Sequence, residues 1–225
     1  MPPMPPLNQI QMDFYKNYYS KLATEGNGGT YHRYAHKLME KKFKPSNYFP
    51  ATLEIGAGSG EHFEYVNHNF DIYYQSDIRE IKQGFEDSRI SQLVCDAVQV
   101  PLPDESCDRV LSTCLLHHLA DPMAVLVEIR RIVKPGGVVT ILIPSDPGFL
   151  FRFLRKISSE KKLKKLGFKY GKLLHALEHR NHIQSLREQV EFVFTMDEVT
   201  LKSWPFPLKR AWNLNLLYIY NIKKI

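Results

Sequence analysis

Short apolar runs alternate with stretches of helical periodicity through the middle of the chain. Because strands that alternate with helices form parallel sheets covered on both faces, this pattern predicts an α/β domain. The clearest helix spans 122–133, where apolar residues recur every three or four positions between Asp121, a candidate cap, and a Pro-Gly-Gly stop. The five predicted strands are 51–55, 72–76, 92–95, 109–113 and 138–143.

The alternation stops after residue 144. A long basic stretch is expected to be helical, and a shorter helix and two strand-like runs follow it. Because only a short Pro-Phe-Pro connection joins these two runs, they should pair antiparallel. The sheet is therefore expected to be mostly parallel, with one reversed strand near its end. The ranges are 149–182 and 185–194 for the helical stretches, and 199–204 and 214–222 for the strands.

The N-terminal segment has a different character. Residues 1–6 are rich in proline, and 11–42 are expected to be mostly helical with a glycine-rich break at 25–29. The start of the chain lacks the basic region of a signal peptide. No uncharged apolar run approaches the roughly 18 to 20 residues that cross a bilayer. A cytoplasmic location without a transmembrane segment is expected.

Composition adds limited information about partners. A length of 225 residues fits one large domain, and a net charge of +6 permits an anionic partner without requiring one. The three cysteines are an odd number, which argues against a disulfide framework in a cytosolic chain. Their spacing fits no zinc motif, so no metal site is expected.

A glycine-rich turn, LEIGAGSGE at 53–61, follows the first predicted strand. Such a loop alone is weak evidence, because a tight strand–helix turn needs no ligand. Three carboxylates strengthen it, since Glu54, Asp77 and Asp96 fall at the carboxyl ends of strands, where open α/β sheets bind ligands. No G-K-[ST] follows the glycines, and Glu61 replaces the third glycine of the dinucleotide fingerprint. The site suits a nucleoside with a cationic tail.

Four segments resemble successive motifs of class I S-adenosylmethionine-dependent methyltransferases: LEIGAGSGEH, SDI, CDAVQVPLPDESCDRVLSTCLLHHL and EIRRIVKPGG, over about residues 50 to 145. More narrowly, they resemble the small-molecule branch that includes the ubiquinone/menaquinone and deoxyaminosugar methyltransferases. The resemblance implies S-adenosyl-L-methionine as cofactor. It also implies a Rossmann-like, seven-stranded, mostly parallel sheet with an antiparallel last strand, helices on both faces and an N-terminal helical lid.

The resemblance also implies a set of cofactor-binding residues. Asp77 would bind the ribose hydroxyls, Asp96 would accept from the adenine amine, and Glu54 would orient the glycine loop. Each carboxylate has an alternative role as a helix cap or a solvated strand end. The remaining candidates are Gly56, Ala57, Gly58 and Gly60 near the methionine and ribose, Ile78 and Ala97 near the adenine, Thr113 and Cys114 beside the methionine, and Tyr19, Tyr31 and His32 in the lid.

Two adjacent histidines, His117 and His118, follow the fourth strand. Adjacent side chains on a helix diverge, so joint chelation of a metal is not expected. The resemblance places this pair beside the active site, where His118 could hydrogen-bond the acceptor or take its proton as the catalytic residue. A purely structural histidine is the alternative. Methyl transfer from a sulfonium is an in-line displacement with a neutral leaving group, so no catalytic acid is needed.

The basic stretch interleaves lysines and arginines with apolar residues. It is either a solvated face over packed side chains or a cap that holds an anionic acceptor group. The acceptor could be small or carrier-linked, such as a sugar of a surface-polysaccharide pathway or a lipid-like molecule, and peripheral membrane contact would fit a lipid headgroup. The expected organisation is a tail and lid (1–45), a cofactor-binding core (46–148), a basic helical insertion (149–183) and a closing helix with the antiparallel strand pair (184–225).

The function predicted from the sequence is methyl transfer to such an acceptor. Two alternatives are RNA methylation through the basic insertion and a non-catalytic S-adenosylmethionine-binding protein. RNA is disfavoured because the chain has no base-methylation tetrapeptide like N-P-P-Y and no appended RNA module. A nicotinamide oxidoreductase is weaker still, because the third fingerprint glycine is missing.

Overall fold

A seven-stranded sheet in the order β3-β2-β1-β4-β5-β7-β6 forms the centre of the computed structural model, which describes residues 7–19, 26–81 and 87–225. β7 runs antiparallel to both β5 and β6, and the other neighbouring strands are parallel. The predicted Rossmann-like α/β fold with a reversed last strand is confirmed. The strands are β1 (Ala51–Ile55), β2 (Ile72–Asp77), β3 (Ile90–Val94), β4 (Cys107–Thr113), β5 (Val133–Pro144), β6 (Glu198–Trp204) and β7 (Leu217–Lys223).

The helices differ from the sequence prediction in two places. α3 begins at Gly26, so the glycines that were expected in a loop at 25–29 lie in the first turn of this helix. The first backbone N–H groups of any helix have no partner within it, so this turn imposes few demands on its residues. The basic stretch at 149–182 divides into three helices, because the backbone turns at Ser158 and at Gly167, whose φ is +86°. The helices are α1 (Leu7–Asn17), α3 (Gly26–Glu40), α4 (Pro122–Ile132), α5 (Phe149–Ile157), α6 (Ser159–Lys165), α7 (Gly171–Glu178) and α8 (Ile183–Val193), with 3-10 turns η1 (Glu61–Tyr65) and η2 (Leu116–His118).

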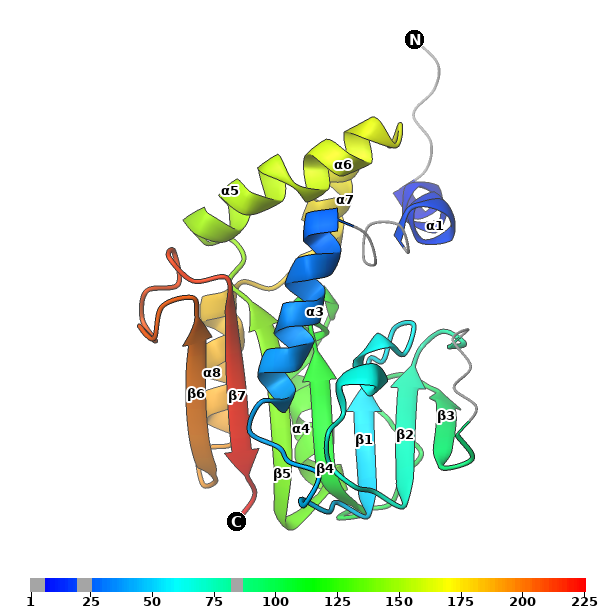
Figure 1. Ribbon diagram of the computed structural model, residues 1–225, viewed down its shortest axis with the longest axis vertical. Coiled ribbons are helices and arrows are strands. Elements are labelled where there is room, and N and C mark those ends of the chain that lie inside the picture. The colour runs from blue at the N-terminus through cyan, green and yellow to red at the C-terminus, as the bar shows by residue number, and fades with distance from the viewer. Residues whose placement is uncertain (1–6, 20–25, 82–86) are drawn as a thin grey trace.

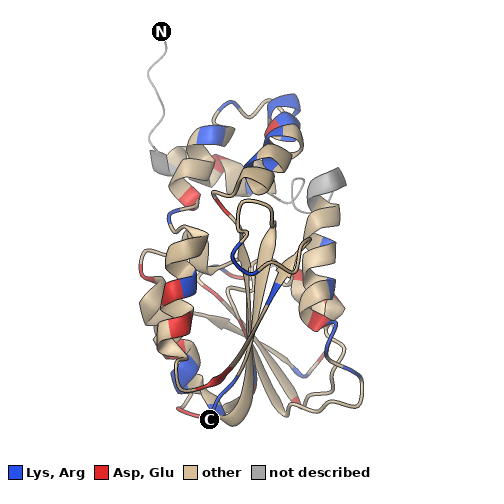
Figure 2. Cartoon of the chain, turned by 90° about the vertical axis from the view of Figure 1, so that its left-hand side faces the viewer, with Lys and Arg blue, Asp and Glu red and all other residues tan. Residues whose placement is uncertain are grey.

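Helices cover both faces of the sheet, with α3 on one face and α4 and α8 on the other (Figures 1 and 2). The apolar side of α4 is fully buried: Val125, Leu126, Ile129 and Ile132 are 0% exposed. The predicted cap of this helix is confirmed, because the Asp121 carboxylate accepts from the backbone N–H of Ala124 at 3.0 Å. The core therefore lies on both sides of the strands and holds their carboxyl ends in fixed positions.

A second layer of helices lies beyond the carboxyl ends of the parallel strands. Figure 1 shows α5, α6 and α7 above these ends, with α1 beside them. Apolar side chains join the N-terminal helix to the insertion, since Ile10 and Phe14 pack with Leu163, Phe168 and Leu174. We call α1 and α5–α7 together the cap. Within the described ranges, no helix has the length and apolar character to span a bilayer.

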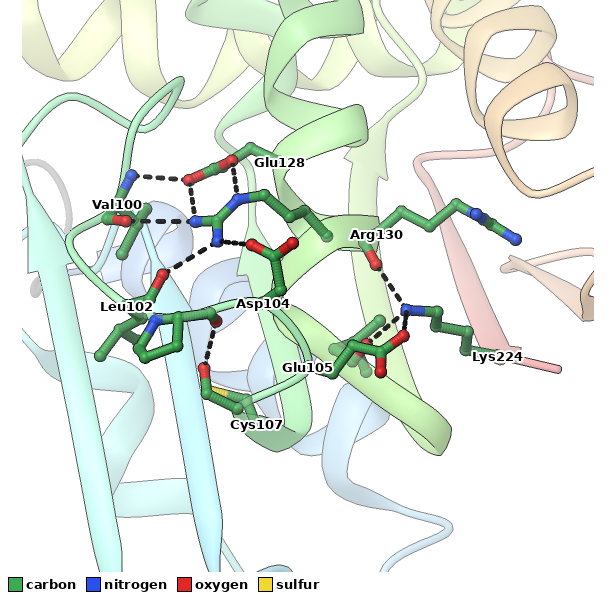
Figure 3. A network of polar contacts seen from close by, with 12 residues as sticks. Val100, Leu102, Asp104, Glu105, Cys107, Glu128, Arg130 and Lys224 are labelled. Carbon is green, nitrogen blue, oxygen red and sulfur yellow. Dashed lines mark hydrogen bonds and ion pairs between the residues drawn. The ribbon is translucent and has the colours of Figure 1, made fainter.

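The loop after β3, which carries Asp96, is fixed to α4 by a polar network (Figure 3). The Glu128 carboxylate accepts from the backbone N–H of Val100 at 2.8 Å. Arg131 bonds Glu128 and also donates to the carbonyl of Leu102 at 3.0 Å. Since these contacts satisfy backbone groups of an irregular segment, they hold the loop against the sheet without regular secondary structure.

Candidate active site

A cavity of about 1090 Å³ lies between the carboxyl ends of the strands and the cap. Of the fifteen residues predicted for the site, Gly60 does not line it; its N–H instead donates to the carbonyl of Ala57 at 2.8 Å within the turn. The fourteen that line the cavity are Tyr19, Tyr31, His32, Glu54, Gly56, Ala57, Gly58, Asp77, Ile78, Asp96, Ala97, Thr113, Cys114 and His118.

The glycine loop turns in a backbone conformation that side chains rarely adopt. The φ angles of Gly56, Gly58 and Gly60 are +72°, +61° and +86°. The N–H groups of Gly56 and Ala57 donate to the carbonyl of Ser76 at 2.8 and 2.9 Å, which ties the loop to β2. Around Gly58, an added Cβ would meet the hydroxyl of Tyr19 and a carboxylate oxygen of Glu61 only at 3.8 Å, so a ligand can approach this backbone.

Asp77 lies at the end of β2, beside the glycine loop. One carboxylate oxygen accepts from the N–H of Gly58 at 2.9 Å, and the other accepts from the N–H of Arg79 at 3.0 Å. Nε of Arg79 also donates to the second oxygen at 3.4 Å, so the oxygen bonded to Gly58 is the one that keeps a further acceptor position, because a carboxylate has about four. Arg79 in turn lies over the Tyr15 ring of α1, 4.5 Å from its centroid, so the cap contacts this end of the cavity.

Glu54 is buried at the end of β1, with 2% of its surface exposed. The hydroxyl of Tyr73 donates to its carboxylate at 3.0 Å. Burial raises the pKa of Glu54 to about 7, and the nearby His62 and the Tyr73 hydrogen bond only partly oppose this shift. The carboxyl group therefore changes charge near neutral pH and favours a cation beside it.

The adenine-side candidates lie at the cavity edge. Asp96 accepts from the N–H of Val98 at 3.1 Å, a local turn that fixes the carboxylate. Ile78 is 70% exposed, which leaves an apolar surface for a planar ring.

Cys114, which also lines the cavity, has a φ of +53°, uncommon for a residue with a side chain, and burial raises the pKa of its thiol to about 12.

The lid candidates belong to two segments of the N-terminal region. The hydroxyl of Tyr31 on α3 donates to the carbonyl of Leu216 at 3.3 Å. Burial raises the pKa of Tyr19 to about 12, with a further contribution from the Glu61 carboxylate, and burial lowers the pKa of His32. These groups are therefore uncharged at neutral pH and form a polar but neutral wall.

The far end of the cavity contains residues that sequence reasoning missed. The Glu178 carboxylate on α7 accepts from Gln11 at 2.6 Å and from Tyr15 at 2.7 Å, which fastens α1 to the insertion. The backbone carbonyl of the same residue accepts from Nδ1 of His118 at 3.0 Å. Burial opposes ionisation of Glu178, but His118, whose Nδ1 lies 3.5 Å from the carboxylate, and the hydrogen bonds from Tyr15 and Gln11 lower its pKa to about 2. Glu178 therefore links the lid helix to the predicted catalytic histidine.

The two adjacent histidines do not diverge as expected. Because they lie in η2 rather than in an α-helix, the ring centroids of His117 and His118 are 4.0 Å apart. Two cap histidines, His175 and His179, lie at the same end of the cavity. His175 lies on α7 and His179 directly follows it, so their spacing of four indicates a shared helix face in the sequence, but nothing there indicates that this face meets η2.

The donor set suits a nucleoside that carries positive charge. Among the described residues, seven carboxylates line the cavity, and at Gly58 the wall is bare backbone. They are Glu54, Glu61, Glu64, Asp77, Asp96, Glu160 and Glu178. Asp77 has a free acceptor position for a ribose hydroxyl, and the buried carboxyl of Glu54 is stabilised in its ionised form by a nearby cation. These residues fit S-adenosylmethionine, which has ribose hydroxyls, an ammonium and a sulfonium.

Residues 53–141 match the family model described as a methyltransferase domain. The match covers the glycine loop and the strand ends that line the cavity. The chain contains a class I S-adenosylmethionine-dependent methyltransferase domain. This confirms the family predicted from the motifs, and with it S-adenosylmethionine as the cofactor of the domain.

Relatives of the methyltransferase domain differ in what their names say they act on. tRNA (carboxymethyluridine(34)-5-O)-methyltransferase ALKBH8 of Macaca fascicularis is 26% identical over 141 residues, 60% of this chain and 20% of that protein. Malonyl-[acyl-carrier protein] O-methyltransferase of Marinomonas sp. is 29% identical over 103 residues, 42% of this chain and 38% of the relative. The ubiquinone/menaquinone biosynthesis C-methyltransferase UbiE of Desulfotalea psychrophila is 34% identical over 70 residues, 31% of this chain and 28% of the relative.

This chain therefore spans well under half the length of these curated relatives. A solved S-adenosylmethionine-dependent methyltransferase from Archaeoglobus fulgidus shares the fold, with a TM-score of 0.63 at 15% identity over 92% of this chain and 100% of that one. The names of the curated relatives give different acceptors, so the similarity does not identify the acceptor of this chain.

Proposed function

We propose that this domain transfers a methyl group from S-adenosylmethionine to an oxygen of a carboxylate, on a small or carrier-linked acceptor. The observation that carries the proposal is Arg155, a guanidinium that lines the acceptor end of the cavity. Its Nε and Nη1 atoms are buried and make no hydrogen bond within the described part of the chain. Nε lies 3.3 Å from a carboxylate oxygen of Glu160, an ion pair without hydrogen-bond geometry.

The side chain of Arg155 is 20% exposed, and a guanidinium whose buried Nε and Nη1 atoms make no hydrogen bond is well suited to a carboxylate. Its planar fork matches the two oxygens of that group, and leaving its donors unpaired in a buried place costs about 1–3 kcal/mol or more. The exposed lysines of α6, by contrast, do not line the cavity. Lys161, Lys164 and Lys165 are exposed, and α6 is one of the cap helices on which Figure 2 shows lysine and arginine positions. Arg155 is therefore a better candidate for holding an anionic acceptor than the lysine cluster.

The names of two relatives support the same chemistry. One acts on a carboxymethyluridine and the other on a malonyl group, both named as O-methyltransferases. These two acceptors differ in their carriers, a tRNA and an acyl-carrier protein, but share a carboxyl group. A carboxylate held by Arg155 accounts for both without requiring this chain to bind either carrier.

A carboxylate is already deprotonated at neutral pH, so it needs no general base. When bound, S-adenosylmethionine supplies an electrophilic methyl group and a neutral leaving group. The chain then has to hold the acceptor oxygen in line and exclude water. The contacts of Glu178 with Gln11 and Tyr15 close α1 over the cavity, and Arg155 orients the acceptor. This mechanism requires no hydrogen bond from His118 to the acceptor, because Nδ1–H of His118 already donates to the backbone carbonyl of Glu178.

The nature of the methylated bond tests this proposal directly. The protein is incubated with S-adenosylmethionine labelled in its methyl group and with a cell extract, and the labelled product is treated with alkali. A methyl ester releases labelled methanol, whereas N-methyl, C-methyl and ether products do not. Alkali-stable label would reject the carboxylate acceptor while retaining methyl transfer. Separating the label into protein, RNA and small-molecule fractions then identifies the carrier.

Changing Arg155 to Gln is expected to raise the KM for the acceptor by about ten- to hundredfold, because the acceptor loses one charged hydrogen-bonding partner. Affinity for S-adenosylmethionine, measured by calorimetry, should change little. The matched control replaces Lys161, Lys164 and Lys165 with Gln, which removes three charges from the exposed face of α6. If the lysine variant lost acceptor affinity and the Arg155 variant kept it, the exposed face of the cap would hold the acceptor instead.

Glu54 gives the cofactor site a pH dependence that can be measured without an acceptor. In the protein without cofactor the pKa of Glu54 is about 7. A bound cation lowers this pKa, so below pH ~7 the binding of the cofactor releases a proton from Glu54. Affinity for S-adenosylmethionine should therefore increase as pH rises from 5 to 7, by up to about tenfold per pH unit. Calorimetry on Glu54→Gln should show weaker binding with a flat profile. Parallel profiles for both proteins would contradict this role.

A further inference from the structure

Histidines from two separate segments meet at the acceptor end of the cavity. His117 and His118 belong to η2, and His179 follows α7. The ring centroid of His179 lies 4.4 Å from that of His117 and 5.1 Å from that of His118. Each of the three rings offers one nitrogen, and these nitrogens lie within 4.8 Å of one another.

One of these rings has an unsatisfied nitrogen. His117 is 3% exposed, and its buried Nδ1 has no hydrogen-bond partner in the part of the chain that the structure describes. A buried polar atom without a partner is rare in native proteins, because its desolvation is not compensated. This ring therefore needs a partner that the protein side chains around it do not supply.

The other two rings are oriented as metal-bound imidazoles usually are. Nδ1–H of His118 donates to the backbone carbonyl of Glu178 at 3.0 Å, and Nδ1–H of His179 donates to the carboxylate of Asp146 at 2.8 Å. With Nδ1 donating, Nε2 of each neutral ring carries a lone pair. A backbone carbonyl and a carboxylate are the partners that fix this tautomer in metal sites.

We infer that His117, His118 and His179 form a binding site for a divalent transition metal, for which zinc is the best-suited ion. Three imidazole ligands with a fourth position open toward a cavity are a known arrangement for zinc in catalytic sites. Imidazole also suits copper, nickel and iron, but not magnesium or calcium, which prefer oxygen. The open position would face the acceptor and could hold an anionic oxygen.

The charges around the cluster are compatible with a dication. The carboxylates of Asp146 and Glu178 adjoin it, and the second lies 3.5 Å from Nδ1 of His118. The positive Arg155 is near enough to influence His179, so it opposes the ion in part. His175 lies 2.8 Å from the same Asp146 oxygen, so the position of the Asp146 carboxylate is accounted for without a metal ion. This contact leaves Nδ1 of His117 without a partner, however, and a metal ion bound through that nitrogen would supply one.

Zinc titration of the purified, chelator-treated chain tests the site without any acceptor or cofactor. We expect one zinc per chain, measured by competition with a chromophoric chelator, and a tetrahedral cobalt spectrum when Co²⁺ replaces zinc. His179→Gln should weaken zinc binding by more than about 100-fold, and Asp146→Asn by about 10- to 100-fold through loss of ligand orientation. Because zinc binding is read directly, its failure is distinguishable from failure of the proposed methyl transfer.

The matched control is His182→Gln, which removes an exposed histidine three residues beyond His179. It should bind zinc as the parent does. His118→Gln serves as a second ligand variant, with circular dichroism as the check that each variant is folded. Absence of stoichiometric zinc in the parent, or equal affinity of the His179, His118 and His182 variants, would overturn the site.

Discussion

Asp77→Ala is expected to weaken the binding of S-adenosylmethionine by about ten- to hundredfold while leaving the fold intact. The carboxylate lines the cavity at the end of β2, its oxygen bonded to Gly58 keeps a free acceptor position, and losing a charged acceptor costs roughly 1.5–3 kcal/mol. Each 1.4 kcal/mol is about tenfold in the dissociation constant. Calorimetric titration with S-adenosylmethionine measures the effect without knowledge of the acceptor.

Asp87→Ala is the matched control for this prediction. Like Asp77, Asp87 accepts from both the backbone N–H and the Nε of an arginine two residues later, but it does not line the cavity. Its replacement should leave cofactor affinity unchanged. Asp77→Asn keeps an oxygen for the N–H of Gly58 but loses the charge, and it should fall between the parent and Asp77→Ala. Unchanged affinity in a folded Asp77→Ala protein would remove Asp77 from the ribose site.

The cofactor half of the cavity was predictable from the sequence because its residues depend on local pattern. Glu54, Asp77 and Asp96 each end a strand, and parallel strands bring such ends to one edge of a sheet. The glycine loop is likewise a local signal, since its positive φ angles require residues without a side chain. The one departure is Gly60, whose place inside the turn depends on how tightly the loop closes.

The acceptor half was not predictable, because it depends on contacts between distant segments. The sequence shows that 149–182 is basic and amphipathic, but not where Ser158 and Gly167 turn the chain. Those turns bring Arg155 and Glu178 into the cavity. The same limitation applies to His117 and His118, which a 3-10 turn places side by side.

A buried arginine shows the same contrast inside the core. Arg109 lies in an apolar predicted strand. A charged side chain buried there needs a partner, but the sequence does not show which residue provides it. The partner is Glu40, 69 residues away at the end of α3. Neither side chain is exposed beyond 1%, and His62 also donates to the Glu40 carboxylate at 3.0 Å. The Arg109 guanidinium further lies 3.8 Å from the centroid of the Phe43 ring.

Glu40→Ala is therefore expected to lower the free energy of unfolding by about 3–5 kcal/mol, because it leaves the buried charge of Arg109 unpaired. Urea unfolding measures this, with Glu191→Ala as control. Glu191 pairs with Arg187 at 3.4 Å and accepts from the Tyr220 hydroxyl at 2.9 Å, but it is 47% exposed, so its loss should cost much less, about 1 kcal/mol. If Glu40→Ala unfolds completely, the double variant Glu40→Met, Arg109→Met should refold, since removing both charges leaves neither buried alone.

The pH dependence of unfolding separates this ion pair from simple packing. Burial would raise the pKa of Glu40, but the hydrogen bond from His62 and the charge of Arg109 outweigh it and lower the pKa to about 2. Its stabilising contribution is therefore complete above pH ~4.5, the ordinary value, and is lost as pH falls toward 2. The double methionine variant should lack this acid-sensitive component.

Since α3 also carries Tyr31 and His32 into the cavity, weakening its anchor at Glu40 should reduce cofactor affinity as well, whereas Glu191→Ala should not. An acid profile of the double variant identical to that of the parent would contradict this account of how α3 is held.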